Sequence, residues 1–238
     1  MRSIGRSTHA ARTAGAHIRY ITRPQALPIL MGARMPVERR AARRWLDAQE
    51  QSDRKNARVI DKVTIALPRE LNAVQRVELV RAFAAEVSQG RVAWLAAVHD
   101  QGKYADNPHA HVVLRDRDLQ TGKMALRMSQ SGSTEMLRGT WERVCNAALE
   151  RAGMDERIDR RTLEAQGIER VPTKHIGPQA RQIEAREPQG SWKIAALTEE
   201  RAAAHGRLRP VVERAAGFLA RAGTLAKNLF GRNSERST

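Results

Sequence analysis

The fold is constrained most by one short stretch, Asn107–Leu114, in which His109 and His111 flank a single alanine and lead into Val-Val-Leu. This pattern predicts a β-strand, and because alternate side chains of a strand share a face, both imidazoles would point the same way. A second predicted strand, residues 92–99, ends in His99, and the polar segment between the two is typical of a turn that joins antiparallel neighbours. The sequence therefore predicts a hairpin that gathers three imidazoles at one end of a sheet.

His99, His109 and His111 are the residues expected of an open metal site. Neutral imidazoles bind a metal through a nitrogen lone pair, and three of them leave positions for substrate oxygens and water. A single strand histidine is more often a core or surface residue, but three of the seven in the chain converging through one hairpin favour a metal site. The spacing alone leaves the metal and the reaction open.

Net charge narrows the range of partners. The 238 residues carry a formal charge of +16, with a pI near 11.3, and most of the basic residues are arginine, which can bind phosphate through two parallel hydrogen bonds. This excess indicates a nucleic-acid partner whose affinity falls as salt rises. The alternatives are a histone-like or ribosomal packing protein, or a GC-rich genome that favours arginine. A GC-rich genome replaces lysine with arginine, which leaves the net charge unchanged and so does not explain the excess.

Strands and helices alternate along most of the chain, which predicts an α+β fold with a central, mostly antiparallel β-sheet covered by helices. The first helix is expected to begin near Thr8 and to end shortly before Pro24. The other expected elements are helices over 36–55, 72–88 and 133–152, a strand over 59–67 and a mobile loop over 115–133. The expected domains are 1–178 and a basic helical C-terminal extension over 179–238, with helix over 193–230.

Cysteine usage and hydropathy exclude two further classes. A single cysteine, Cys145, rules out a disulfide framework and is expected to pack in a helix core in a reducing compartment. No stretch approaches the roughly 20 consecutive apolar residues that a membrane-spanning helix needs. We therefore expect no stable membrane insertion.

Four separated stretches resemble one family of DNA-processing proteins. The histidine hairpin resembles the His-hydrophobe-His motif of HUH endonucleases, and the helix around Tyr20 resembles the nucleophile helix of plasmid mobilisation relaxases. Residues 66–71 and 157–170 also look like segments of the MobA/MobL relaxases. A strand precedes the tyrosine helix in that family, and only residues 1–6 are left for it here. The similarity covers residues 1–178, and the four motifs in this order are far more specific than the histidine motif alone.

The resemblance implies a metal-dependent, site- and strand-specific DNA relaxase that nicks single-stranded origin-of-transfer DNA in plasmid mobilisation. Tyr20 would attack the phosphodiester and leave a 5′-phosphotyrosine and a free 3′-hydroxyl. Mn²⁺ or Mg²⁺ held by His99, His109 and His111 would grip the non-bridging phosphate oxygens and align the ester. Glu70, just beyond a predicted strand end, is a candidate proton acceptor or imidazole partner. The alternative is a surface glutamate that precedes a helix.

Only two tyrosines are available as the nucleophile. Tyr104 lies in the hairpin turn near the predicted metal and could compete chemically. Tyr20 is preferred because it lies on a helix in the basic N-terminal region and matches the family position. A phenol has an unperturbed pKa of about 10, so a nearby base or metal must help to remove its proton.

Arginines supply the expected DNA contacts, on the helix of Tyr20, on the next helix and in the segment after the core. The expected DNA-binding residues are Arg12, Arg19, Arg23, Arg40, Arg43, Arg44, Arg160 and Arg161. The resemblance also implies relaxosome accessory proteins and a type IV coupling protein as partners, in the bacterial cytoplasm. Two alternatives stay open: a non-catalytic origin DNA-binding module and a rolling-circle replication initiator of the same superfamily.

Overall fold

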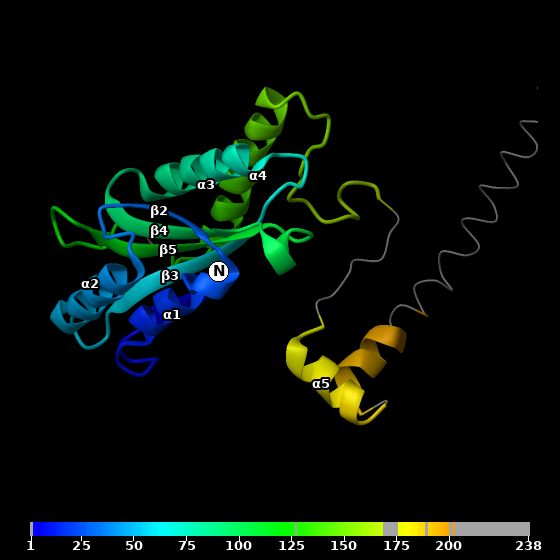
Figure 1. Cartoon of the computed structure of the whole chain (residues 1–238), viewed down its shortest axis with the longest axis horizontal. Coiled ribbons are helices and arrows are strands. Elements are labelled where there is room, and N and C mark those ends of the chain that lie inside the picture. Colours follow the sequence, from blue (N-terminus) through cyan, green and yellow to red (C-terminus); the bar gives the residue numbers. More distant parts are fainter. Residues whose placement is uncertain (1, 127, 169–175, 189, 200–201, 203–238) are drawn as a thin grey trace, which may run out of the picture. The chain divides into compact units, whose positions relative to one another are not determined.

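The fold is that of a computed structural model of the 238-residue chain (Figure 1). The structure describes residues 2–126, 128–168, 176–188, 190–199 and 202. The chain divides into two compact units, Met1–Arg160 and Arg161–Thr238, which are described separately.

A five-stranded antiparallel sheet forms the centre of the first unit, with the strand order β1-β3-β5-β4-β2 (Figure 1). Its strands are β1 (Arg2–Gly5), β2 (Ile29–Ala33), β3 (Arg58–Ala66), β4 (Val92–His99) and β5 (His109–Asp118). The hairpin of β4 and β5 lies in the middle of the sheet, because β3 and β2 flank it on either side. The predicted hairpin is therefore confirmed, and it is protected from solvent at both edges.

Helices cover both faces of this sheet (Figure 1). One face carries α1 (Thr13–Ile21) and α2 (Arg39–Ser52), and the other carries α3 (Ala73–Ser88) and α4 (Ser133–Arg151). Two apolar cores follow from the alternation of β5. Val112 and Leu114 face α3 and α4, and Val113 faces α1 and α2. The expected α+β fold, a sheet covered by helices, is confirmed.

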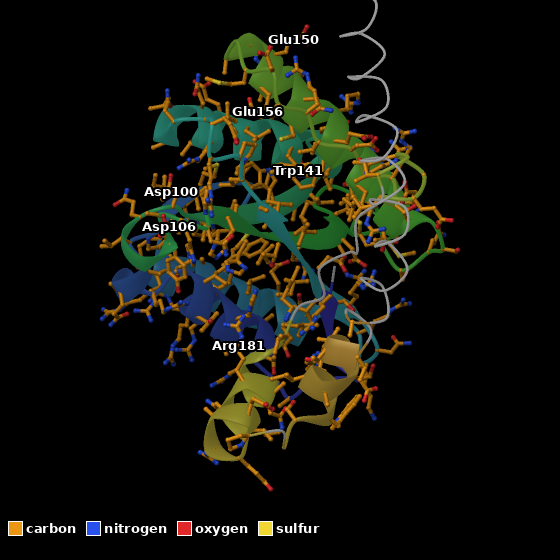
Figure 2. The ribbon with its side chains drawn as sticks, turned by 90° about the vertical axis from the view of Figure 1, so that its right-hand side faces the viewer. Asp100, Asp106, Trp141, Glu150, Glu156 and Arg181 are labelled. Carbon is orange, nitrogen blue, oxygen red and sulfur yellow. The ribbon has the colours of Figure 1, made fainter. Side chains whose placement is uncertain are left out.

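The helices on the α3 and α4 face match the sequence pattern closely. The Asn72 side chain accepts from the Gln75 backbone N–H while the Gln75 side chain accepts from the Asn72 N–H, a capping box that starts α3. The Trp141 ring of α4, labelled in Figure 2, meets the Phe83 ring of α3 edge-on at 5.3 Å. Gly153 adopts a left-handed φ of 71° just after α4, where glycine meets little strain.

Three expected boundaries were wrong. The first helix begins at Thr13 rather than near Thr8, because the backbone N–H groups of Thr8 and His9 both donate to the Gly5 carbonyl in a turn. The second begins at Arg39 because the Glu38 carboxylate accepts from two backbone N–H groups of its first turn, at 2.8 and 2.7 Å. Residues 115–118, expected in a loop, continue β5.

Buried ion pairs explain why the charged end of β5 stays in the sheet. The Arg115 guanidinium donates two parallel hydrogen bonds, at 2.9 and 3.0 Å, to the Asp53 carboxylate, and both side chains are almost fully buried. A pattern of alternating charges indicates a loop only when the charges are solvated. Here Arg115 and Arg117 both pair with Asp53, and Asp118 pairs with Arg91, which offsets the desolvation of these charges.

Asp61 of β3 is expected to make the stability of the fold depend on pH. Burial raises the pKa of this carboxyl from 3.8 to about 7, opposed by Arg58 and reinforced by Asp116. Between pH 4 and pH 7 the native state therefore keeps a proton that the unfolded chain has lost. The free energy of unfolding should fall by about 2–4 kcal/mol as the pH rises through this window.

Chemical denaturation of Asp61→Asn at several pH values tests this dependence. The variant should show a flatter profile between pH 4 and pH 7 than the wild type. Exposed Asp155 supplies the control, and Asp155→Asn should leave the profile unchanged. An identical slope in Asp61→Asn and the wild type would contradict the prediction.

In the second unit, the described residues include α5 (Pro178–Arg186) and a helical segment over 192–199. Most of the helix expected over 193–230 lies outside the described residues. Among the residues that the structure does describe, no helix has the length and apolar character required to cross a membrane.

Candidate active site

The three histidines of the hairpin form a compact triangle, here called the histidine triad (His99, His109 and His111). His99 and His109 are direct antiparallel partners, and His111 lies two residues further along β5 on the same face. The ring centroids are 5.2 Å apart for His99 and His109, 5.1 Å for His99 and His111, and 5.2 Å for His109 and His111. One nitrogen from each ring lies within 4.8 Å of the others, a spacing that could hold a metal ion.

Each triad imidazole uses its other nitrogen in the protein. His99 Nε2 donates to the Ile21 carbonyl at 2.8 Å, His109 Nδ1 donates to the Asn107 carbonyl at 2.8 Å, and His111 Nδ1 lies 3.3 Å from the Thr64 hydroxyl oxygen. A proton on that nitrogen leaves a lone pair on the other, which is how ligating histidines are usually oriented. The Nδ1 atom of His99 is buried without a hydrogen-bond partner among the described residues. The donor set therefore fits a divalent cation.

The surroundings of His99 and His111 favour the neutral form of both imidazoles. Burial lowers the pKa of His111 to about 3, with further lowering by His109, His99, His17 and Arg23 in that order. Burial also lowers the pKa of His99, partly opposed by its hydrogen bond to Ile21. Neutral imidazole is the form that binds metals, so no proton has to be removed from these two rings at neutral pH.

The turn that follows β4 begins with a residue on the opposite face of the sheet from the triad. Figure 2 shows Asp100 and Asp106 on this segment between β4 and β5. The Asp100 carboxylate is buried and pairs with Arg76 of α3 at 3.6 Å. Asp100 therefore faces the α3 side of the sheet while the adjacent His99 faces the α1 side.

Tyr20 lies in the last turn of α1, and 59% of its surface is exposed. The Arg23 guanidinium lies over its ring, 4.3 Å from the centroid, and donates to the Tyr20 carbonyl at 2.7 Å. The same guanidinium donates to the Tyr104 hydroxyl at 2.6 Å. Arg23 thus links the two tyrosines, and His99 fixes the carbonyl of the residue after Tyr20.

Tyr104, the last residue of the short helix η2 (Gly102–Tyr104), packs against two rings of the triad. Its ring centroid lies 5.3 Å from that of His99 and 5.2 Å from that of His109. Its hydroxyl oxygen accepts the hydrogen bond from Arg23, so this tyrosine supports the guanidinium that lies over Tyr20.

Glu70 is not brought to the triad by any described hydrogen bond or ion pair. It lies exposed in the segment between β3 and α3. Its charge acts instead on Cys145 of α4, whose thiol pKa is raised to about 11 by burial first and by Glu70 second. The chain turns here toward the α3 and α4 face, where the neighbouring Leu67 and Leu71 are buried.

Five arginines of α1 and α2 line an open cavity of about 490 Å³ that has a single acidic lining residue, Asp47. We call them the arginine surface: Arg19, Arg39, Arg40, Arg43 and Arg44. Arg43 pairs with Asp47 at 3.5 Å, and Arg39 donates to the Arg19 carbonyl at 3.4 Å. Four of these arginines were expected to contact DNA, and Arg39 joins them because it faces Arg19 of the neighbouring helix.

The remaining predicted arginines differ in their surroundings. Arg12 precedes α1 with a left-handed φ of 64°, and its backbone N–H donates to the buried Glu50 carboxylate. Arg160 contacts Glu135 at 2.6 Å and Glu142 at 2.7 Å, so two carboxylates offset its charge. Arg161 belongs to the second unit.

Sequence reasoning missed two residues beside the triad. His17 precedes Tyr20 by three residues on α1, and Thr64 is the strand partner of His111 on β3. Helical spacing points to His17, since residues three apart share a face. Thr64 could be found only once the register of β3 and β5 is known.

The fold and the site together define a class of protein: an α+β protein with a histidine triad on its sheet, next to a helix that carries a tyrosine. The sequence pattern of the MobA/MobL family matches residues 12–186. The chain belongs to the MobA/MobL family of mobilisation and conjugal-transfer relaxases.

Several curated proteins are similar to this chain. Mobilization protein A of Escherichia coli is 35% identical over 169 residues, covering 62% of this chain and 23% of that protein. Mobilization protein MobL of Acidithiobacillus ferridurans is 32% identical over 178 residues, covering 60% of this chain and 47% of that protein. The match therefore spans between about a quarter and a half of these relatives.

A solved structure described as "Molecular Basis of Vancomycin Resistance Transfer in Staphylococcus aureus" shares the fold. It aligns with a TM-score of 0.50 and 19% identity, over 68% of this chain and 96% of that one. This likeness bears on the fold alone.

Proposed function

We propose that this chain is the nicking domain of a mobilisation relaxase, which cuts one strand of origin-of-transfer DNA through Tyr20 in a metal-dependent transesterification. One observation carries the proposal: the 2.8 Å hydrogen bond from His99 Nε2 to the Ile21 carbonyl ties the helix of Tyr20 to the histidine triad. Family membership supports the reaction class, and this contact supports the choice of residues.

The reaction joins the Tyr20 phenolic oxygen to the phosphorus while the bond from phosphorus to the 3′ oxygen breaks. The products are a 5′-phosphotyrosine and a 3′-hydroxyl, and overall the phenolic proton passes to the leaving oxygen. One phosphodiester replaces another, so the covalent intermediate conserves the ester and can reseal the strand. Arg23 lies over the Tyr20 ring and beside the triad, where a guanidinium can bind the phosphate that Tyr20 attacks.

Mn²⁺ or Mg²⁺ is the proposed cofactor, held by the free nitrogens of His99, His109 and His111. When bound, such an ion supplies positive charge to the phosphate oxygens and polarises the ester. Neutral ligands leave the full charge of the ion available to an anionic substrate. The chain itself contributes the orientation of the rings, through Ile21, Asn107 and Thr64.

Single-stranded origin DNA is the proposed substrate, and the arginine surface supports its binding. Phosphate contacts from arginine position a strand without reading its sequence. We also infer a cytoplasmic location in a bacterium, relaxosome accessory proteins as partners and a possible type IV coupling protein. These inferences rest on family membership.

The arginine surface should contribute strongly to the salt dependence of DNA binding. Arg40→Gln/Arg44→Gln removes two exposed charges. Each arginine–phosphate contact with a single strand releases about 0.7 of a counterion when it forms, so losing two contacts should flatten the slope of log affinity against log salt by about 1.4. Fluorescence anisotropy with single-stranded DNA measures this slope. The control Arg81→Gln/Arg151→Gln removes two exposed charges from α3 and α4. Equal slopes for the two variants would contradict the assignment.

A denaturing gel with labelled single-stranded origin DNA tests the proposed function. The wild-type chain should give a slower DNA-linked protein band with Mn²⁺ and none with EDTA. Binding without any such band would favour the non-catalytic DNA-binding module. A band that forms equally well in EDTA would overturn the metal dependence.

A further inference from the structure

A second cavity, of about 400 Å³, lies beside the triad on the α1 face of the sheet. Its lining includes Arg2 of β1, His17 of α1, Lys62 and Thr64 of β3, and His111 of β5. His111 belongs to both the cavity and the triad, so the two sites are contiguous. We call it the β1–β3 cavity.

Two cations face each other in this cavity. Arg2 and Lys62 are direct partners in the antiparallel pair of β1 and β3, and like charges in that position destabilise a sheet. Burial lowers the pKa of Lys62, and the charge of Arg2 lowers it further. Neither side chain belongs to any of the ion pairs among the described residues. The cavity therefore contains more positive charge than the fold itself uses.

His17 adds an unused polar atom to the same space. Its Nε2 is buried without a hydrogen-bond partner among the described residues, although buried polar atoms are normally paired. Burial, and then the charge of Lys62, lowers the pKa of His17 to about 4. A neutral imidazole still has one N–H, so His17 can donate to an anion without adding charge.

Thr64 can supply another donor. Its hydroxyl oxygen lies 3.3 Å from His111 Nδ1. When that oxygen accepts the imidazole N–H, the hydroxyl proton is left to point elsewhere. Thr64 can therefore orient the His111 ring and donate a hydrogen bond to a molecule in the cavity at the same time.

We propose that the β1–β3 cavity binds a second phosphate of the DNA strand, next to the one that Tyr20 attacks. Arg2 and Lys62 supply the charge, while His17 and Thr64 donate hydrogen bonds. The occupant is a phosphodiester of the substrate rather than a free anion, because the cavity shares His111 with the triad and His17 shares a helix with Tyr20. This inference rests on the proposed function, and it assigns the strand a path from the triad toward β1.

The experiment measures binding of oligo-dT to the Tyr20→Phe chain in EDTA, so that neither nicking nor a metal is needed. Arg2→Gln and Lys62→Gln should each weaken binding about 10-fold at low salt and flatten the salt slope by about 0.7. Because both side chains contact one phosphate, the double variant should flatten the slope by about 0.7 and not by twice that amount. The control Arg81→Gln removes an exposed charge from α3 and should leave the slope unchanged.

Two further readouts separate binding from a structural role. Without DNA, Lys62→Gln should be at least as stable as the wild type to denaturant, since it removes a like-charge contact. In a chain labelled with ¹⁵N-histidine, oligo-dT should shift the His17 ring resonances of the parent, and Lys62→Gln should abolish this shift.

The possible outcomes are distinct. Salt slopes of Arg2→Gln and Lys62→Gln equal to that of Arg81→Gln, or His17 resonances that do not respond to oligo-dT, would overturn the inference alone. A response to inorganic phosphate but not to oligo-dT would assign the cavity to a free anion and would also overturn it. A chain that binds no single-stranded DNA would overturn the proposed function with it. Normal binding without a covalent band would overturn only the proposed reaction.

Discussion

Tyr20→Phe should form no covalent DNA adduct with Mn²⁺, a loss of at least about 10³-fold in the rate of adduct formation. The substitution removes the oxygen that would bond to phosphorus in the proposed reaction. It leaves the ring, so its contact with the Arg23 guanidinium is retained. Since 59% of Tyr20 is exposed, the fold loses no buried hydrogen bond. Denaturing gels with labelled origin DNA measure the adduct, and circular dichroism checks that the variant is folded.

Tyr104→Phe is the matched control, because it removes the same atom from the other tyrosine. Its hydroxyl accepts a hydrogen bond from Arg23, so we expect a slower reaction, by about 10-fold, with the adduct still formed. An adduct that persists in Tyr20→Phe and disappears in Tyr104→Phe would move the nucleophile to the hairpin turn. Loss of the adduct in both variants would require a further test for a direct role of Arg23.

The central hairpin could be predicted from sequence because its information is local. Alternation around His109 and His111, a buried strand ending at His99 and a polar turn between them are all contained in residues 92–114. Strand periodicity determines which side chains share a face, and antiparallel pairing then brings the three rings together. The same local logic predicted a helix over 72–88, and α3 occupies Ala73–Ser88.

Contacts between distant elements could not be predicted in this way. The β1–β3 cavity depends on the register of Arg2 with Lys62, and on α1 placing His17 above the sheet. β2 was missed because its five residues lack a clear alternation, and its place beside β4 comes from pairing alone. Arg160 illustrates the same limit, since nothing near it in sequence indicates that Glu135 and Glu142 offset its charge.

One hydrogen bond connects the central hairpin of the sheet to α1 at the site. His99 is 1% exposed and uses Nε2 to fix the Ile21 carbonyl at the end of α1. The Nδ1 atom of the same ring is buried without a hydrogen-bond partner among the described residues, which leaves it available to a metal. A single imidazole thus sets the position of the tyrosine helix relative to the proposed metal, so His99 is a poor choice for testing the metal alone.

His109→Ala is the cleaner test of the metal site. Among the described residues, the Nδ1 atom of His109 bonds to the nearby Asn107 carbonyl and does not hold a distant element in place. We expect Mn²⁺ affinity to fall by at least about 100-fold, more than is typical for loss of a mere supporting contact. At limiting Mn²⁺ the adduct should disappear, and excess Mn²⁺ should restore part of it, since two triad nitrogens remain. Electron paramagnetic resonance of free Mn²⁺ measures affinity independently of nicking.

Exposed His9 provides the matched control, and His9→Ala should bind Mn²⁺ as the wild type does. Unchanged Mn²⁺ affinity in His109→Ala would overturn the triad as the metal site. Weakened Mn²⁺ binding with an undiminished adduct would instead separate the triad from catalysis, because Tyr20 would then react without the ion. The combination of weakened binding and partial rescue is expected only if the triad ion acts on the phosphate that Tyr20 attacks.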